Sequence, residues 1–132
     1  MYNVTKGIYV ASKSRHGQMW RRLRAEGLPI ISTWIDECED GQTTSWSQLY
    51  ERCIREASVC AAFVLYVPMG DEPRGGAYME MGAALAGHVP VYAFAPGAPK
   101  HLLAHPGVVL CDSLQSALQW AKHKTMTDQE AL

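Results

Sequence analysis

The sequence has no excess of charge of either sign and no long apolar run. Its 132 residues carry 12 Lys and Arg side chains against 13 Asp and Glu, for a formal net charge of −1. This balance provides no general field for a nucleic-acid polymer or an anionic membrane surface. No apolar run approaches the roughly 20 residues that a membrane-spanning helix needs, and no basic segment at the N-terminus leads into a long apolar one. We therefore expect no membrane span, no signal peptide, and no nucleic-acid polymer or membrane as a partner.

Cysteine pairs of the kind that bind zinc are also missing. The cysteines form neither a C-x-x-C pair nor a zinc spacing; they are Cys38, Cys53, Cys60 and Cys111. Most of them lie in apolar surroundings, where a reduced, buried thiol is usual. His101 and His105 have i, i+4 spacing, but no acidic or thiol partner is near and Pro106 ends the segment. These features predict no metal and no cofactor, and a reducing, cytoplasmic location.

Apolar segments of two kinds alternate along the chain. Short β-branched runs predict strands at 7–12, 28–33, 60–67, 89–94 and 108–111. Apolar residues at helical spacing predict helices at 14–27, 46–57, 77–87 and 112–124. This alternation predicts a single α/β domain over 1–132, with its core at about 7–124 and a frayed tail. The expected fold is a flavodoxin/Rossmann-like three-layer sandwich with a five-stranded parallel sheet in the order 2-1-3-4-5.

Hydroxyl and cationic side chains follow the first expected strand. Residues 12–17 read Ser-Lys-Ser-Arg-His-Gly at a strand-to-helix junction, where such groups can bind a phosphate. The loop matches neither G-x-x-x-x-G-K-[ST] nor G-x-G-x-x-G, which excludes a Walker A loop and a dinucleotide-binding fingerprint. It also lacks the run of hydroxyls and glycines that holds a flavin phosphate, which disfavours an electron carrier. The loop predicts an anion site at Ser12, Ser14 and Arg15, with a solvated helix cap as the alternative.

A glutamate lies one turn inside the expected third helix. Gly75 and Gly76 open that helix, where glycine lets a ligand approach the backbone and the helix start favours an anion. The buried face of the helix can be supplied by other residues: Met79, Met81, Ala84 and Leu85. Glu80 is then free to attack a sugar C1 or to stabilise a cationic transition state. The alternative is that Glu80 only complements the helix dipole.

Aromatic side chains occur near two of the expected strand ends. Tyr9 can hydrogen-bond a carboxylate or a sugar oxygen, or it can be a core tyrosine with a satisfied hydroxyl. Trp34 follows the second expected strand and is followed by two carboxylates, Asp36 and Glu37. An indole there can stack on a base while a carboxylate binds the edge of that base.

Residues 7–94 together resemble the nucleoside 2-deoxyribosyltransferase family, including its 2′-deoxynucleoside 5′-monophosphate N-glycosidases. The stretch "GIYVAS", the arginine-rich helix after it and "EASVCAAFVLYV" each resemble a segment of that family. The strongest likeness is "GGAYMEMGAALAGHVPVYAF", which resembles the signature G-x-x-x-E-x-G-x-A and the G-x-P-V strand that follows it.

The resemblance implies a role for each candidate residue. Glu80 would attack C1′ and form a glycosyl-enzyme ester, and Tyr9 would orient the glutamate. Substrate contacts would come from Ser12, Ser14, Arg15, Trp34, Asp36, Asp71, Arg74, Gly75 and Gly76. The ligand would be a nucleotide or nucleoside, and a homodimer or higher homo-oligomer is expected because relatives commonly assemble in this way.

The sequence departs from the family at two aspartates of the third strand. Cys60 and Tyr66 stand in their places, and Asp71 or Glu72 would have to substitute from the loop. The charged first loop also suits a phosphorylated ligand better than a nucleoside. These departures favour hydrolysis or plain binding of a nucleotide over base exchange. They keep open a non-catalytic nucleotide-binding module of the same fold.

Overall fold

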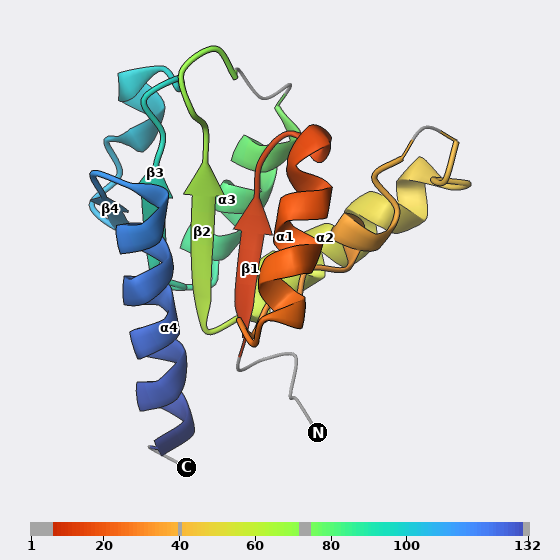
Figure 1. Ribbon diagram of the computed structural model, residues 1–132. Helices are drawn as coiled ribbons and strands as arrows, with labels where there is room; N and C mark the ends of the chain where they lie inside the picture. Colours follow the sequence, from red (N-terminus) through yellow and green to blue (C-terminus); the bar gives the residue numbers. More distant parts are fainter. Residues whose placement is uncertain (1–6, 40, 72–74, 131–132) are drawn as a thin grey trace.

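A parallel sheet forms the centre of the chain (Figure 1). The structure is a computed structural model and describes residues 7–39, 41–71 and 75–130. The strands lie in the order of their numbering: β1 (Ile8–Ala11), β2 (Ala62–Tyr66), β3 (Val91–Phe94) and β4 (Val108–Leu110). The α-helices are α1 (Gly17–Ala25), α2 (Trp46–Val59), α3 (Gly76–Ala86) and α4 (Leu114–Glu130). The parallel α/β architecture predicted from the alternation of strands and helices is confirmed.

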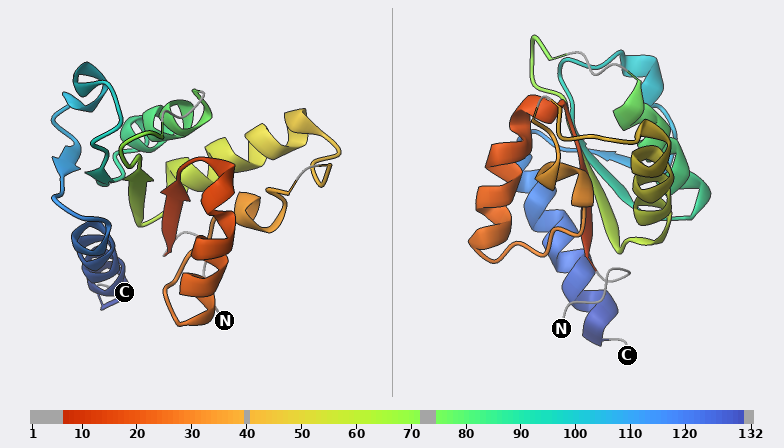
Figure 2. Two further views of the ribbon diagram at one scale, coloured as in Figure 1. Left: turned by 45° about the horizontal axis from the view of Figure 1, so that its top comes forward. Right: turned by 90° about the vertical axis from the view of Figure 1, so that its right-hand side faces the viewer.

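Helices cover both faces of the sheet. Figure 2 shows α1 and α4 on one face and α2 and α3 on the other, which makes three layers. Every residue of β1 is buried, as are the first four of β2. Strands covered on both faces have no solvent side and are therefore apolar without alternation. Tyr9 pairs in register with Phe63 of β2, and the two rings stack with centroids 5.4 Å apart.

The prediction of five strands is wrong, because the described residues form a sheet of four, although these four lie in the relative order that 2-1-3-4-5 gives them. The segment 28–33 forms one isolated parallel bridge, between Ile30 and Ile8. Beyond that bridge, the backbone N–H of Val10 donates to the side-chain oxygen of Ser32 at 2.8 Å. A hydroxyl thus takes the place of the backbone carbonyl that would continue the ladder, and the 3₁₀-helix Thr33–Asp36 begins directly afterwards.

The ends of the helices partly follow the sequence pattern. Ser45 caps α2, as predicted, by accepting a hydrogen bond of 3.2 Å from the backbone N–H of Gln48. The expected frayed tail is wrong, because α4 continues to Glu130. Thr125 stays fully buried one turn beyond Ala121 and donates to its carbonyl at 2.9 Å. No helix in the described ranges is both long and apolar enough to cross a membrane.

Candidate active site

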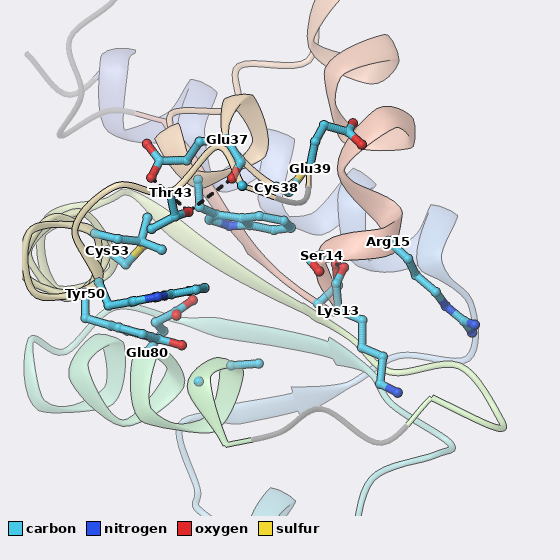
Figure 3. A pocket seen from close by; sticks show the side chains of 17 residues that line it. Lys13, Ser14, Arg15, Glu37, Cys38, Glu39, Thr43, Tyr50, Cys53 and Glu80 are labelled. Atoms are coloured by element: carbon cyan, nitrogen blue, oxygen red, sulfur yellow. Dashed lines mark hydrogen bonds between the residues drawn. The ribbon is translucent and has the colours of Figure 1, made fainter.

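A cavity of about 730 Å³ opens beyond the carboxyl end of β1 (Figure 3). Its walls come from the loop at 12–15, the segment at 34–43, the first half of α2 and the start of α3. A cleft at this edge of a parallel sheet is where α/β proteins commonly bind ligands. The sequence pointed to the same loops, so the polar loop residues lie at the end of the sheet where the cavity opens.

Glu80 lies in the wall of this cavity with its carboxylate held by a phenol. Tyr9 Oη donates a hydrogen bond of 2.8 Å to Glu80 Oε1. Tyr9 is fully buried, and Glu80 is 7% exposed. Burial raises the pKa of Glu80 to about 7; the hydrogen bond from Tyr9 opposes this rise and the charge of Glu56 adds to it. Burial and the charge of Glu80 raise the pKa of Tyr9 well above its usual value, so the phenol remains the donor.

Glu80 belongs to the buried face of α3. The buried residues of this helix are Ala77, Glu80, Met81 and Ala84. Met79, which the sequence assigned to that face, is 48% exposed, so this assignment is wrong. The spacing i, i+3, i+4, i+7 puts one carboxylate in an otherwise apolar stripe, and this signal was available in the sequence.

Glycine at the start of α3 keeps space open beside the carboxylate. A Cβ on Gly76 would lie 3.1 Å from Tyr50 Oη and 3.7 Å from Glu80 Oε2. Gly75, the residue before the helix, has φ of +90°, a conformation that side chains rarely adopt. Because residue 76 is a glycine, no side chain from that position lies beside Glu80 Oε2.

Two residues of α2, Tyr50 and Cys53, line the cavity near Glu80 (Figure 3). Burial raises the pKa of the Cys53 thiol to about 12, with a smaller opposing effect from its hydrogen bond with Tyr9. Burial and the charge of Glu80 also raise the pKa of Tyr50. Both groups are neutral at physiological pH, which explains why burial dominates the pKa of Glu80.

The loop after β1 is tied to the loop after β2 through Asp71. This aspartate is 1% exposed, accepts a hydrogen bond from the Arg15 guanidinium and pairs with the His16 imidazole. Burial, and then the charges of Arg15 and Lys13, lower the pKa of His16. Asp71 therefore acts within the protein, as an anchor for the loop that carries Arg15.

The cationic end of the cavity is formed by this anchored loop. Figure 3 shows Lys13, Ser14 and Arg15 together at one end, away from Glu80. Ser12 also lines the cavity, but its hydroxyl accepts from Trp20 Nε1 at 2.9 Å and donates to the carbonyl of Lys13 at 2.9 Å. The side chain of Ser12 is therefore committed to holding the loop.

The segment after the bridge at Ile30 sends its side chains in different directions. Trp34 lines the cavity, and its Nε1 donates to the carbonyl of Val10 at 2.8 Å, which fixes the ring. Asp36, with half of its side chain exposed, accepts hydrogen bonds of 2.7 and 2.9 Å from Arg24. The hydrogen bond from Arg24 lowers the pKa of Asp36. Glu37, the next residue, lines the cavity instead.

The structure brings most of the predicted substrate contacts together. Those that line the cavity with Glu80 are Ser12, Ser14, Arg15, Trp34 and Gly76. Asp36, Asp71 and Gly75 are not among its described lining residues, whereas Arg74 and Glu72 lie outside the described ranges. Glu37, one of the two carboxylates that the sequence places after Trp34, also lines the cavity. Lining residues that the sequence did not assign to the site are Lys13, Cys38, Glu39, Gly41, Thr43, Trp46, Leu49, Tyr50, Cys53 and Ala77. Within the described part of the chain, no three His, Cys, Asp or Glu side chains gather to hold a metal.

The fold and the cavity define an α/β protein with a buried carboxylate at a candidate ligand site. No protein-family model matches the chain, and no curated protein matches its sequence. In structure, the chain is similar to the CMP N-glycosidase BcmB of Clostridium botulinum, with 13% identity and a TM-score of 0.47. The likeness covers 86% of this chain and 94% of that one.

Proposed function

We propose that this protein cleaves the N-glycosidic bond of a nucleotide or nucleoside, with Glu80 as the nucleophile. The observation that carries the proposal is a buried carboxylate, held by Tyr9 at 2.8 Å, in the wall of a cavity of about 730 Å³. The resemblance of the G-x-x-x-E-x-G-x-A stretch to nucleoside 2-deoxyribosyltransferases points to the same glutamate.

The proposed reaction uses both oxygens of Glu80 in different ways. Oε1 accepts the hydrogen bond from Tyr9, which leaves Oε2, beside Gly76, to attack. Oε2 forms a bond to C1′ while the bond from C1′ to the base nitrogen breaks, and the base leaves with that electron pair and takes up a proton. Water then attacks C1′ of the glycosyl ester and gives up a proton to the solvent, while the bond from C1′ to Oε2 breaks, so that the free sugar leaves and the carboxylate is restored. A second base in place of water would give base exchange.

The cationic end of the cavity favours a phosphorylated substrate. Lys13 supplies an ammonium group and Ser14 a hydroxyl at the end away from Glu80, and Arg15 adds a guanidinium that is largely exposed beside its contact with Asp71. Guanidinium and ammonium groups form charge-assisted hydrogen bonds with phosphate oxygens, which are stronger than neutral ones. A 5′-monophosphate bound there would place its sugar toward the carboxylate.

A panel incubation tests the proposal directly. Purified protein is incubated separately with deoxynucleosides, deoxynucleoside monophosphates, ribonucleotides and NAD, and chromatography measures the free base. We expect base release from at least one class, fastest with monophosphates. Absence of free base from every compound would contradict the proposed cleavage.

Tyr9→Phe is expected to shift the pH dependence of cleavage to higher pH. The ionised form of Glu80 is the nucleophile, so kcat/KM should rise with pH through the Glu80 pKa of about 7 and then level off. The hydrogen bond from Tyr9 lowers that pKa, so its removal should move the rising limb up by about one pH unit. Tyr66→Phe removes a phenol from β2 that does not line the cavity and should leave the profile in place. An unchanged profile in Tyr9→Phe would contradict this role.

Arg15→Ala is expected to weaken binding of a monophosphate by about tenfold, because one charge-assisted contact is lost. Binding of the matching nucleoside should change by less than about threefold, since it lacks the phosphate. Calorimetric titration of both ligands measures the difference. Arg22→Ala, on the exposed surface of α1, is the matched control and should change neither affinity. Equal weakening of nucleotide and nucleoside would argue against a phosphate at Arg15.

A second candidate function is nucleotide binding without cleavage. It is favoured by the chemistry of the groups near Glu80, because a leaving base needs a proton donor. The thiol of Cys53, with a pKa of about 12, and the phenol of Tyr9, with a raised pKa, are both weak acids at neutral pH. A binding module would release no base in the panel, yet one of the nucleotides would raise its melting temperature.

A further inference from the structure

The proposed bond cleavage leaves one carboxylate of the cavity unused. Glu37 lines the cavity, and Figure 3 shows it on a different wall from Glu80 and away from Lys13 and Arg15. A ligand with its phosphate at the cationic end and its sugar at Glu80 still has its base to place. Glu37 is a charged group in the cavity wall that the base of such a ligand can contact.

Hydrogen bonds that begin at Arg52 of α2 hold the side chain of Glu37 in place. Arg52 donates to Glu37 Oε2 at 2.6 Å, and both side chains are about one third exposed. Arg52 also donates to Thr33 Oγ1 at 2.7 Å, and Thr33 in turn donates to Glu56 at 2.8 Å. The other oxygen, Glu37 Oε1, has a longer contact of 3.4 Å with the Thr43 hydroxyl. Arg52 therefore occupies one oxygen of Glu37, and the second is less firmly bound.

Aromatic side chains line the same cavity. Trp34 is fixed by its hydrogen bond to the carbonyl of Val10. Trp46 stacks on Tyr50 with ring centroids 6.4 Å apart, and 64% of Trp46 is exposed. Nucleobases stack on aromatic rings with little regard to base identity. The aromatic residues can therefore hold a base but cannot distinguish one base from another, so selection requires a polar group.

We propose that Glu37 accepts a hydrogen bond from the edge of the bound base and selects bases that carry an exocyclic amino group. A carboxylate has only acceptors, so it pairs with an amino group, as Glu and Asp do with the N4 amino group of cytosine, and repels a carbonyl oxygen. Cytosine and adenine present an amino group where uracil and hypoxanthine present an oxygen. The sequence suggested a carboxylate after Trp34 for this task, and the cavity assigns it to Glu37, because Glu37 is among the described lining residues and Asp36 is not. This inference rests on the proposed function, because it names the substrate class of the same site.

Binding of matched nucleotide pairs tests the inference. Dissociation constants are measured by calorimetry for cytidine and uridine monophosphates, and for adenosine and inosine monophosphates, each with ribose and with deoxyribose. The protein carries Glu80→Gln, so that no ligand is consumed. We expect each amino base to bind about tenfold more tightly than its oxo counterpart, and Glu37→Gln to reduce this ratio to below about threefold because an amide both donates and accepts. The control is Asp36→Asn, which changes the neighbouring carboxylate outside the cavity and should preserve the ratio.

The outcomes separate this inference from the proposed function. Equal binding of amino and oxo bases by the protein with Glu37 intact would overturn the inference while nucleotide binding still stands, and this arm does not depend on the folding of a Glu37 variant. A preference that survives Glu37→Gln would remove Glu37 from base selection. Failure of every nucleotide to bind, together with no base release from the unmodified protein, would contradict the proposed function and the inference with it.

Discussion

Glu80→Gln is expected to lower the rate of base release by about 10³-fold or more, because an amide cannot form the glycosyl ester. Glutamine has nearly the same shape and its carbonyl oxygen can still accept the hydrogen bond from Tyr9. Affinity for the substrate should therefore change little, and the effect should lie in the chemical step. Single-turnover release of base, measured with saturating protein, isolates that step from binding.

The same variant also tests whether Glu80 is buried in solution. A buried carboxylate destabilises the folded chain when it ionises, and glutamine cannot ionise. Burial raises the pKa of Glu80 from its ordinary 4.5 to about 7, so the unfolded chain loses this proton first as the pH rises. Stability therefore falls between about pH 4.5 and 7 and stays low above that range, with an effect on the order of 3 kcal/mol.

Glu80→Gln has no such ionisation, so its melting temperature relative to the unmodified protein should rise from pH 5 to pH 8. Retained base release in Glu80→Gln would remove Glu80 from the mechanism. A stability difference that does not change with pH would mean that this carboxylate is not buried in solution.

The sequence predicted correctly the elements with a long apolar run or strong helical periodicity, and it wrongly predicted a full strand at 28–33. Residues 60–67 are continuously apolar, and they form β2 at the centre of the sheet. The segment 28–33, Leu-Pro-Ile-Ile-Ser-Thr, forms one bridge, because the Ser32 hydroxyl takes the N–H of Val10. Nothing local in the sequence says whether a serine side chain or a backbone carbonyl will meet that N–H.

In the candidate site, too, the sequence could not predict which partner each polar side chain would meet. Loop positions identified Ser12 and Asp71 as polar groups near the ligand, but their partners could not be predicted. Trp20 engages the Ser12 hydroxyl from α1, and Arg15 and His16 engage Asp71 across two loops. The contacts of Asp71 join loops that are far apart in the chain, whereas Trp20 reaches Ser12 from the helix that follows the same loop. Sequence reasoning therefore pointed to the end of the sheet at which the cavity opens, but it could not separate groups that line the cavity from groups that hold the loops.

Gly87→Ala is expected to destabilise the protein by roughly 2–3 kcal/mol, because α3 meets the backbone of α2 at this residue. A Cβ on Gly87 would lie 2.3 Å from the carbonyl oxygen and 3.2 Å from the carbonyl carbon of Ser58. A backbone carbonyl cannot rotate away as a flexible side chain can, so the two helices would have to separate. Because α2 carries Tyr50 and Cys53 and α3 carries Glu80, that separation should also weaken nucleotide binding.

Gly82→Ala is the matched control, because Gly82 lies inside α3, Gly87 directly follows the end of α3, and the two substitutions have opposite expected effects. Apart from its two chain neighbours and the nearby backbone of its own helix, no described atom lies within 4 Å of a Cβ built on Gly82, and alanine inside a helix is more stable than glycine by roughly 0.5–1 kcal/mol. Urea denaturation of both variants should therefore give changes of opposite sign for the same substitution, five residues apart. If Gly87→Ala were as stable as Gly82→Ala, α2 and α3 would not approach closely in solution. The enclosure of Glu80 by α2, which raises its pKa, would then lose its structural basis.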